Sequence, residues 1–376
     1  MKWEKVKLGD MTDSCLGKML DQQKNRGEFQ PYLANVNVRW GTFDLDDLPQ
    51  MRFEENEQER YGLRYGDLVV CEGGEPGRCA IWKEQIPNMK IQKALHRVRA
   101  HDGLDYRYLY YWFLWSGKRG ALEQYFTGAT IKHMPGQKLQ EVLIDKPPFE
   151  IQKRMADILS AYDNLIENNQ KQIKLLEEAA QRLYKEWFVD LRFPGYETTP
   201  VVDGVPEGWH QGTLEELISI NYGKDHKQVP EDGEIPVYGS GGLIRKCNKF
   251  LYIGEAVLIP RKGSLNHIMY VNEAFWTVDT MFYATMKKPN TALFVYFFIS
   301  SFDMYAMNIG AAVPSMTVKI LEAIPLLIPS ENALKRFDDT VKVYFQKIAV
   351  LNKQIEGLAE ARDRLLPKLM SGEIEV

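Results

Sequence analysis

Two long stretches of the chain carry apolar residues at the spacing of a coiled coil. In the later stretch, apolar side chains recur in two columns, the a and d positions of a heptad. The earlier stretch matches it at a constant offset, since 355 − 173 and 365 − 183 both give 182. The pattern predicts two paired helices, over 149–191 and 330–376, whose seam is formed by Met155, Tyr162, Ile166, Ile173, Leu176, Leu183, Phe337, Tyr344, Ile348, Leu351, Ile355, Leu358 and Leu365.

Prolines and amides mark the ends and the interior of these helices. Pro148 and Pro329 stand just before them, where a fixed φ is tolerated, and Pro367 is expected to end the second helix. Gln152 and Asn169 interrupt the apolar seam of the first helix. A buried amide in a coiled coil can fix its register or partner, whereas an amide at a local defect would face solvent, and the sequence leaves both interpretations open. Helices of about 35 residues are roughly 50 Å long, and these two pack most simply antiparallel.

The bodies that precede the two helices repeat the same order of elements. Each contains an apolar strand, a glycine-containing turn and a second strand, at 65–82 and 253–270. Each then has an aromatic helix, at 108–117 and 294–303, and a Gly-Ala loop, the second of which begins at residue 308. An apolar strand and a proline stop follow in both. So many matches in the same order predict an internal duplication.

The predicted fold is therefore α+β, with two mixed α/β bodies, each followed by a long helix. The two helices are expected to pair as an antiparallel coiled coil, and the whole chain forms a pseudo-twofold repeat. The segment between the halves is rich in proline and glycine, as expected of a linker. The predicted domains are 1–148 for the first body, 149–191 for the central helix, 192–207 for the linker, 208–329 for the second body and 330–376 for the C-terminal helix.

The charge and composition limit the possible functions. A net charge of −4 and a pI of about 6.0 argue against a protein that coats nucleic acid non-specifically. DNA binding would need locally basic surface or a partner that supplies positive charge. The four cysteines lack the spacing of a metal site or a disulfide framework, which favours a reducing compartment. The N-terminus has no secretory pattern, and the most apolar run, from Ala292, is shorter than the roughly 20 residues that cross a bilayer, so we expect a cytoplasmic protein.

No catalytic or metal-binding motif stands out. The sequence has no phosphate loop, no nucleophile elbow and no histidine or cysteine spacing typical of zinc. "PVYGSGG" from Pro236 resembles a glycine-rich nucleotide loop, but no suitable helix and acidic residue follow it. "DKPPFE" from Asp145 superficially resembles a motif of amino-methyltransferases, yet Lys146 occupies the position that needs a hydrogen-bond acceptor. We therefore expect a non-catalytic chain with no cofactor or metal of its own.

The duplicated chain, with its variable bodies and near-identical long helices, resembles the specificity (S) subunit of Type I restriction–modification systems. The residues that carry the resemblance are "PEGWHQGTLEEL" from Pro206, "IPVYGSGG" from Ile235, "IPRKGS" from Ile259, "LYKEWFVDLRFPGYE" from Leu183 and "LLPKLMSGEIEV" from Leu365. The first body keeps fewer of these motifs, with "QPYLANVNVRWG" from Gln30 where the second has "IPVYGSGG". The resemblance spans the whole chain.

The resemblance implies that each body is a target recognition domain that reads one half of a bipartite site in double-stranded DNA. It also implies that the helices space the bodies and dock two methyltransferase (M) subunits, which would use S-adenosylmethionine to methylate adenine. Two restriction (R) subunits, with ATP and Mg, would translocate and cut the DNA. None of that chemistry would reside in this chain.

Loops that interrupt the predicted strands offer polar and basic side chains for base edges and phosphates. The candidates in the first body are Arg39, Trp40, Arg78, Lys132 and His133, and those in the second body are Tyr238, Ser240, Arg261, Lys262, Ser264 and Asn266. The basic, glycine-turned segment "IPRKGSLNH" is the strongest of these, because a hairpin tip of this kind fits a DNA groove.

Three alternatives stay open at this point. A single-chain restriction or methylation enzyme would need the catalytic motifs that the sequence lacks. A specificity subunit of a standalone methylation system would have the same sequence features without any R subunit. A coiled-coil scaffold joining two modules that do not bind DNA would share the helices but not the DNA binding, and a mobility-shift assay with and without M subunits would distinguish it.

Overall fold

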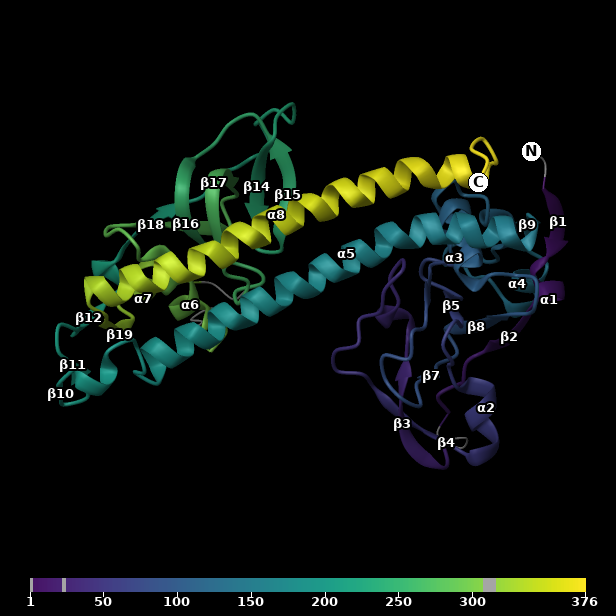
Figure 1. Cartoon of the computed structure of the whole chain (residues 1–376), viewed down its shortest axis with the longest axis horizontal. Helices are drawn as coiled ribbons and strands as arrows, with labels where there is room; N and C mark the ends of the chain where they lie inside the picture. The colour runs from purple at the N-terminus through teal and green to yellow at the C-terminus, as the bar shows by residue number, and fades with distance from the viewer. Residues whose placement is uncertain (1–2, 22–24, 307–315) are drawn as a thin grey trace. The chain divides into compact units, whose positions relative to one another are not determined.

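The computed structural model of the chain describes residues 3–21, 25–306 and 316–376. Two long helices dominate it, α5 (Phe149–Tyr184) and α8 (Glu331–Met370) (Figure 1). The chain divides into two compact units. Unit 1 comprises Met1–Asn169 and Lys353–Val376, and unit 2 comprises Gln170–Asn352. Each long helix therefore contributes one part to each unit.

Unit 1 is built from small sheets, antiparallel except where β3 pairs with β7 in parallel, and one buried helix. Its four-stranded sheet has the order β2 (Thr12–Leu16), β8 (Leu95–Ala100), β5 (Leu68–Cys71) and β6 (Cys79–Ile81). A three-stranded sheet has the order β4 (Gln50–Phe53), β3 (Glu28–Leu33) and β7 (Lys90–Ile91), and β1 (Glu4–Lys7) pairs with β9 (Leu143–Lys146). The shorter helices are α1 (Leu8–Met11), η1 (Asn35–Asn37), η2 (Glu55–Glu57), α2 (Gln58–Tyr61), α3 (Tyr106–Lys118), η3 (Glu123–Tyr125) and α4 (Gly136–Gln140).

The core of unit 1 forms around α3, which is buried over most of its length because its sequence is apolar and aromatic all round. Asp105 caps this helix, since its carboxylate accepts hydrogen bonds from the backbone N–H groups of Arg107 (2.8 Å) and Tyr108 (3.1 Å). The start of α5 and the end of α8 pack into the same core through residues such as Met155 and Leu369. The start of α5 and the end of α8 are thus part of unit 1.

Unit 2 is built around a larger sheet with the order β13 (Ile218–Tyr222), β18 (Met281–Met286), β16 (Tyr252–Pro260), β17 (Met269–Thr277), β14 (Ile235–Gly239) and β15 (Gly242–Cys247). β14 runs parallel to β17, and the other neighbours are antiparallel. Two pairs lie outside it, β10 (Val201–Val202) with β11 (Val205–Pro206) and β12 (His210–Thr213) with β19 (Pro325–Ile328). The shorter helices are η4 (Lys185–Val189), η5 (Tyr196–Thr198), η6 (Leu214–Glu216), α6 (Ala292–Ser300) and α7 (Val318–Glu322).

Each unit contains its own hydrogen bond at an equivalent position. Leu8 N donates to Val142 O (2.8 Å) in unit 1, and Leu214 N donates to Ile324 O (3.0 Å) in unit 2. β1 and β9 pair in unit 1 as β12 and β19 do in unit 2. The predicted α+β duplication is therefore confirmed. The Gly-Ala loop predicted from residue 308 falls in 307–315, outside the described residues.

Within each unit, a part of α5 packs against a part of α8. In unit 1, Asp163 pairs with Arg362, and Asn169 Nδ2 donates a hydrogen bond to Gln354 Oε1 (3.3 Å). Residue numbers rise along α5 while they fall along α8, so this pairing is antiparallel. In unit 2, the Phe337 ring lies near those of Tyr184 and its neighbours at the end of α5.

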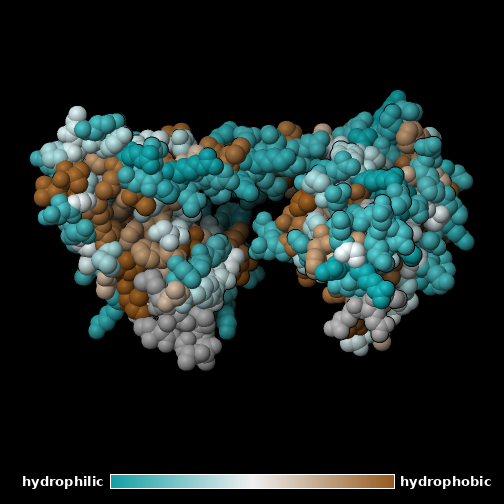
Figure 2. Space-filling view, turned by 90° about the horizontal axis from the view of Figure 1, so that it is seen from below, coloured by the Kyte–Doolittle hydropathy of each residue, from teal (hydrophilic) through white to brown (hydrophobic). Residues whose placement is uncertain are grey.

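The predicted seam residues Met155, Tyr162, Ile166, Ile173, Leu176, Leu183, Phe337, Tyr344, Ile348, Leu351, Ile355, Leu358 and Leu365 are all buried or partly buried. Between them the helices carry exposed, mostly polar positions, and on the face seen in Figure 2 the surface of the helices is mostly hydrophilic. This distribution is the one that helix pairing requires.

The two amides of the first helix are both buried. Gln152 accepts a hydrogen bond from Asp105 N (3.0 Å) and donates to Gly103 O (3.2 Å) and Pro147 O (2.8 Å), so it fixes the start of α5 to the body of unit 1. Asn169 faces α8, as described above. Neither amide is a solvent-facing defect.

The expectation that Pro367 ends the second helix was wrong, because α8 continues to Met370. Proline lacks the N–H that would bond to the preceding turn, which normally breaks a helix. Here Leu366, Leu369 and Met370 are buried in the core of unit 1, and their burial favours one further helical turn. Ser371 N donates to Pro367 O at 3.0 Å and closes that turn.

Candidate nucleic-acid interface

The predicted site residues of unit 1 gather around the turn between β5 and β6, residues 72–78, which we call turn A. Arg78 donates to Glu75 Oε2 (3.0 Å) and to the side chain of Asn35 (2.7 Å), and its side chain is mostly buried. The indole N–H of Trp40 donates to the other oxygen of Glu75 (2.7 Å). Gly117 makes room for the Trp40 ring, since a Cβ there would lie 2.8 Å from it. Trp40 and Arg78 therefore share one carboxylate.

A second loop of unit 1, residues 126–134, lies along turn A. His133 forms bridges with Thr127 and Gly73, and its Nδ1 lies 3.4 Å from Glu72 Oε2. Met134 N donates to Glu72 O (2.7 Å), and Met134 O lies 2.9 Å from Nε2 of the buried His96. Burial lowers the pKa of His96, which favours the neutral ring as donor to that carbonyl. The loop that presents Lys132 and His133 is thereby fixed to the sheet.

The two remaining basic candidates of unit 1 differ in their surroundings. The guanidinium of Arg39 donates to the backbone carbonyls of Val36 and Val38, so it stays on its own loop. Lys132 is exposed and has no ion pair or hydrogen bond from its ammonium group to any described residue. Lys132 is the candidate in this unit whose charge is fully available to a ligand.

In unit 2 the equivalent turn joins β16 and β17 over residues 261–268, and we call it turn B. Met316 N donates to Arg261 O at 3.0 Å, which reproduces the bond from Met134 to Glu72. The β14–β15 turn packs against it, because His267 Nδ1 lies 3.0 Å from Ser240 O and a Cβ on Gly263 would lie 2.6 Å from Ser240 Oγ. Gly263 also has a φ of +84°, which favours glycine.

Some predicted residues of unit 2 make internal contacts. Asn266 donates from Nδ2 to Asp303 Oδ1 (3.2 Å) and accepts from Met304 N (2.8 Å), so it holds the turn after α6. Tyr238 donates its hydroxyl proton to Glu273 Oε1 (2.9 Å), and burial, followed by that carboxylate, raises the pKa of Tyr238. Asn266 thus holds turn B from within the unit, and Tyr238 ties β14 to β17.

Among the described residues, no acidic group pairs with the basic side chains of turn B. The guanidinium of Arg261 lies over the rings of Tyr222 and Phe282, 5.5 and 5.9 Å from their centroids. Lys262 and Ser264 are exposed, and neither side chain has a hydrogen-bond or ion-pair partner among the described residues. Turn B therefore presents two cations and a hydroxyl on a rigid hairpin tip.

Turns A and B have the same backbone connection and opposite chemistry. Turn A carries Glu72 and Glu75 with the internally bonded Arg78, whereas turn B carries Arg261 and Lys262. His267, which lies on the Ser240 carbonyl, was missed in the sequence because a single histidine in a loop gives no signal. The structure thus brings Trp40 and Arg78 together at turn A and Ser240 against Gly263 of turn B, whereas Arg39 bonds within its own loop.

No group of three or more potential metal ligands occurs in 3–21, 25–306 or 316–376. In the same residues, no helix is both long enough and apolar enough to span a membrane.

Comparison with known proteins decides the family. The sequence model described as "Type I restriction modification DNA specificity domain" matches residues 1–178 and 206–360, one match for each half of the duplication. The chain belongs to this family. It is a specificity subunit of a Type I restriction–modification system, and the resemblance recognised in its motifs is confirmed.

Similar curated proteins carry the same description. The chain is 28% identical to the Type I restriction enzyme MjaIX specificity subunit of Methanocaldococcus jannaschii, over 83% of this chain and 78% of that protein. It is 24% identical to the MjaVIII specificity subunit of the same organism, over 100% of this chain and 93% of that protein. The crystal structure of a Type I restriction–modification S subunit from M. genitalium superposes with a TM-score of 0.64 at 19% identity, covering 98% of this chain and 96% of that one, and shows the shared fold.

Proposed function

We propose that each unit of this specificity subunit reads one half of a bipartite sequence in double-stranded DNA. The observation that carries the proposal is turn B, where Arg261 and Lys262 stand on a rigid hairpin tip without an acidic partner among the described residues. Cations of this kind bind phosphates and guanine edges, and Ser264 adds a hydroxyl that can donate or accept. The equivalent place in unit 1 holds Lys132 beside turn A.

The same proposal assigns the other candidates supporting roles. Arg78 and Trp40 on Glu75, and Asn266 on Asp303, would hold the loops in position for the residues that contact DNA. Sequence reading needs both kinds of residue, because phosphate and base contacts work only when the loop geometry is fixed.

The partners follow from the same proposal. The paired helices would set the gap between the half-sites and dock two M subunits, which carry S-adenosylmethionine. R subunits with ATP and Mg would complete a restriction system, and the chain itself would be non-catalytic and act in the cytoplasm. A net charge of −4 is compatible with DNA binding if the M subunits supply much of the positive field. The domain boundaries proposed for this division are those predicted from the sequence.

A standalone methylation system is the second candidate for the finer role. It requires the same specificity subunit and M subunits and differs only by the absence of R subunits. The number of subunits that co-purify with the chain from its host decides between the two.

The decisive experiment maps methylated adenines in DNA treated with the chain and its M subunits. We expect a motif with two specific halves and a fixed non-specific gap. Replacing Lys262 with Ala should weaken binding and lower the slope of log affinity against log salt concentration by about 0.9, the value for one phosphate contact.

A matched control is Lys249→Ala. Lys249 is also an exposed lysine of unit 2, but it precedes β16, whereas turn B follows the other end of that strand. This variant should keep the wild-type slope. A continuous motif without a gap, or equal effects of the two variants, would contradict the proposal.

A further inference from the structure

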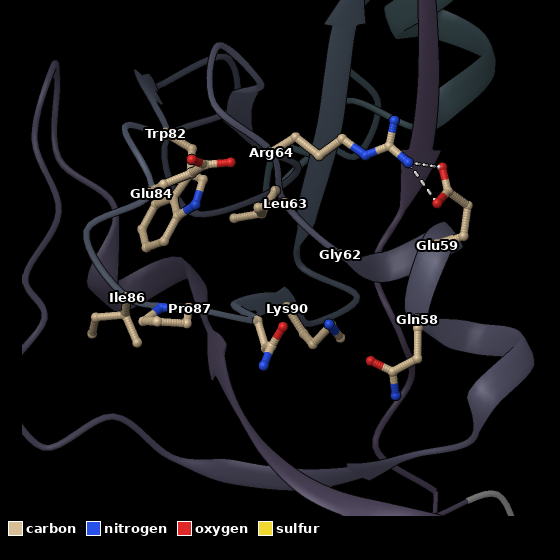
Figure 3. A pocket seen from close by; sticks show the side chains of 11 residues that line it. Gln58, Glu59, Gly62, Leu63, Arg64, Trp82, Glu84, Ile86, Pro87 and Lys90 are labelled. Carbon is tan, nitrogen blue, oxygen red and sulfur yellow. Dashed lines mark hydrogen bonds and ion pairs between the residues drawn. The ribbon is translucent and has the colours of Figure 1, made fainter.

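Unit 1 contains a cavity of about 490 Å³ away from its candidate DNA-contacting loops. Its walls include Gln58 and Arg64 next to α2, Trp82 after β6, Ile86 and Pro87 in the following loop, and Lys90 on β7 (Figure 3). Lys90 is held on both sides by backbone, since it pairs with Tyr32 of β3 and forms a bridge to Gly62. The cavity is therefore a built feature of the small three-stranded sheet.

Lys90 is only 3% exposed, yet its ammonium group has no ion pair or hydrogen bond to any described residue. Among the described residues, two other cations are comparably buried, and both are paired. Lys18 (3% exposed) bonds to Glu57 and to Arg52 O, and Arg97 (4% exposed) bonds to Asp13 at 2.6 Å. An uncompensated buried charge is unfavourable in a folded protein. Lys90 is therefore an exception among these cations, and its ammonium group opens to the cavity, where a ligand can reach it.

The electrostatic surroundings of Lys90 also show no acidic partner for its ammonium group among the described residues. The pKa of Lys90 is lowered by burial alone, with no carboxylate acting in the opposite direction. The acidic groups of the cavity wall have other partners, because Glu59 accepts two hydrogen bonds from Arg64 (2.5 and 2.6 Å) and Glu84 accepts one from Tyr65 N (3.1 Å). No acid of the wall is thus committed to Lys90.

A second unused donor faces the same space. The indole N–H of Trp82 makes no hydrogen bond to a described residue, although the ring is almost fully buried. Figure 3 shows Ile86 and Pro87 on the same side of the cavity as Trp82, whereas the end of the Lys90 side chain lies toward Gln58. The wall of the cavity thus carries a cation, a neutral donor and apolar surface.

We propose that this cavity binds a nucleoside phosphate. The phosphate oxygens would accept from the Lys90 ammonium, and the sugar or base would lie against Ile86 and Pro87, with an acceptor of the nucleoside facing the Trp82 N–H. The volume supports a ligand of this class, because cavities of roughly 300–1,000 Å³ hold small organic molecules, whereas one inorganic phosphate would fill only a small part. The nucleoside phosphate has two possible sources, a free mononucleotide or a nucleotide of the bound DNA. Only the second rests on the proposed DNA recognition.

The test uses the full chain and titration calorimetry with deoxyadenosine monophosphate and with inorganic phosphate. For a free mononucleotide, we expect saturable binding that is tighter than that of inorganic phosphate. Lys90→Met keeps the length of the side chain and removes its charge, and it should weaken binding by about tenfold or more, the usual effect of losing a hydrogen bond to a charged group. Lys93→Met is the matched control, since Lys93 is an exposed lysine three positions further along the chain, and it should leave the affinity unchanged.

A second measurement uses the wild-type chain, so its result does not depend on whether the variant folds. Brief acetylation at mildly alkaline pH, followed by mass spectrometry, reports the accessibility of each lysine amine. Deoxyadenosine monophosphate should protect Lys90 and leave Lys93 unprotected.

The DNA source is tested with M subunits present. If the nucleotide comes from DNA, Lys90→Met should reduce DNA affinity by about tenfold and lower the salt slope by about 0.9, while Lys93→Met should not. Either this result or mononucleotide binding that depends on Lys90 supports the proposal. It is overturned if mononucleotide neither binds nor protects Lys90 and the DNA affinity of Lys90→Met equals that of the wild type. A wild-type chain that binds mononucleotide but no DNA would instead refute the proposed function and leave this site standing.

Discussion

Replacing Phe337 with Ala should destabilise unit 2 selectively. Phe337 is fully buried where the beginning of α8 meets the end of α5. Its ring centroid lies 4.9 Å from that of Phe188, 6.0 Å from Trp187, 6.2 Å from Phe297 and 6.3 Å from Tyr184. Removing a buried phenyl ring usually costs about 3–5 kcal/mol, because the lost contacts leave a cavity that the surroundings fill only partly.

The size of this effect is large compared with the total stability of a domain, which is roughly 5–15 kcal/mol. Native-state hydrogen exchange with mass spectrometry measures it separately in each unit. A loss of about 4 kcal/mol corresponds to exchange that is roughly a thousandfold faster for the slowest amides of β16, β17 and β18, since about 1.4 kcal/mol is a factor of ten. The slowest amides of α3, in unit 1, should keep their rates.

Val343→Ala provides the control for this experiment. Val343 lies on the same helix and in the same unit, but it is 58% exposed, so its truncation should change the stability by less than about 0.5 kcal/mol. Equal acceleration in α3 and in β16, or a change below about 1 kcal/mol for Phe337→Ala, would refute the reasoning. The first result would mean that the units do not open independently, and the second that Phe337 is not an anchor of the helix pair.

Three further predictions concern the helices and one buried histidine. Asp163→Asn removes the carboxylate that pairs with Arg362 and accepts from Tyr111, and it should destabilise unit 1 by about 1–3 kcal/mol in urea unfolding, whereas unchanged stability would show that this pair is not stabilising. Because burial lowers the pKa of His96, its contribution to stability should be complete above the unfolded pKa of about 6.5 and fall as the pH decreases below it. His96→Asn should therefore reduce the difference between the free energies of unfolding at pH 7 and at pH 5. An unaltered pH dependence of that free energy would contradict this. Inserting four residues, about one turn, into 170–180 should lengthen the gap of the methylated motif and leave both half-sites intact, and altered half-sites with an unchanged gap would contradict the proposed spacing role.

The architecture could be predicted from the sequence because it depends on periodic patterns. The seven-residue spacing of Ile166 and Ile173 specifies a helix face, and the constant offset of 182, as between Ile173 and Ile355, specifies the duplication. The end of α8 was placed wrongly, because the local effect of Pro367 was outweighed by the burial of Leu369 and Met370, which no local pattern reveals.

The candidate site could be predicted only in part. The sequence identified the loops that carry basic residues, but it could not show which side chains are already bonded. Arg78 is held by Asn35, 43 positions away, and Asn266 by Asp303, 37 positions away. Contacts between such distant positions depend on the folded loops. The sequence could not show that Lys90 lacks a partner for the same reason, since this depends on which groups the folded chain places near its ammonium group.

The division of the chain into units also determines the order in which they can form. Unit 2 is a continuous segment, Gln170–Asn352, whereas unit 1 needs Lys353–Val376 in addition to the first 169 residues. During synthesis, unit 2 can therefore close while the partners of Met155 in the last helical turns have not yet been made. The entropic cost of closing a loop rises only slowly with its length, and an intervening segment that is already folded shortens the effective loop. Completion of unit 1 thus becomes the last folding step, and truncation of the final helical turns should leave it open while unit 2 folds.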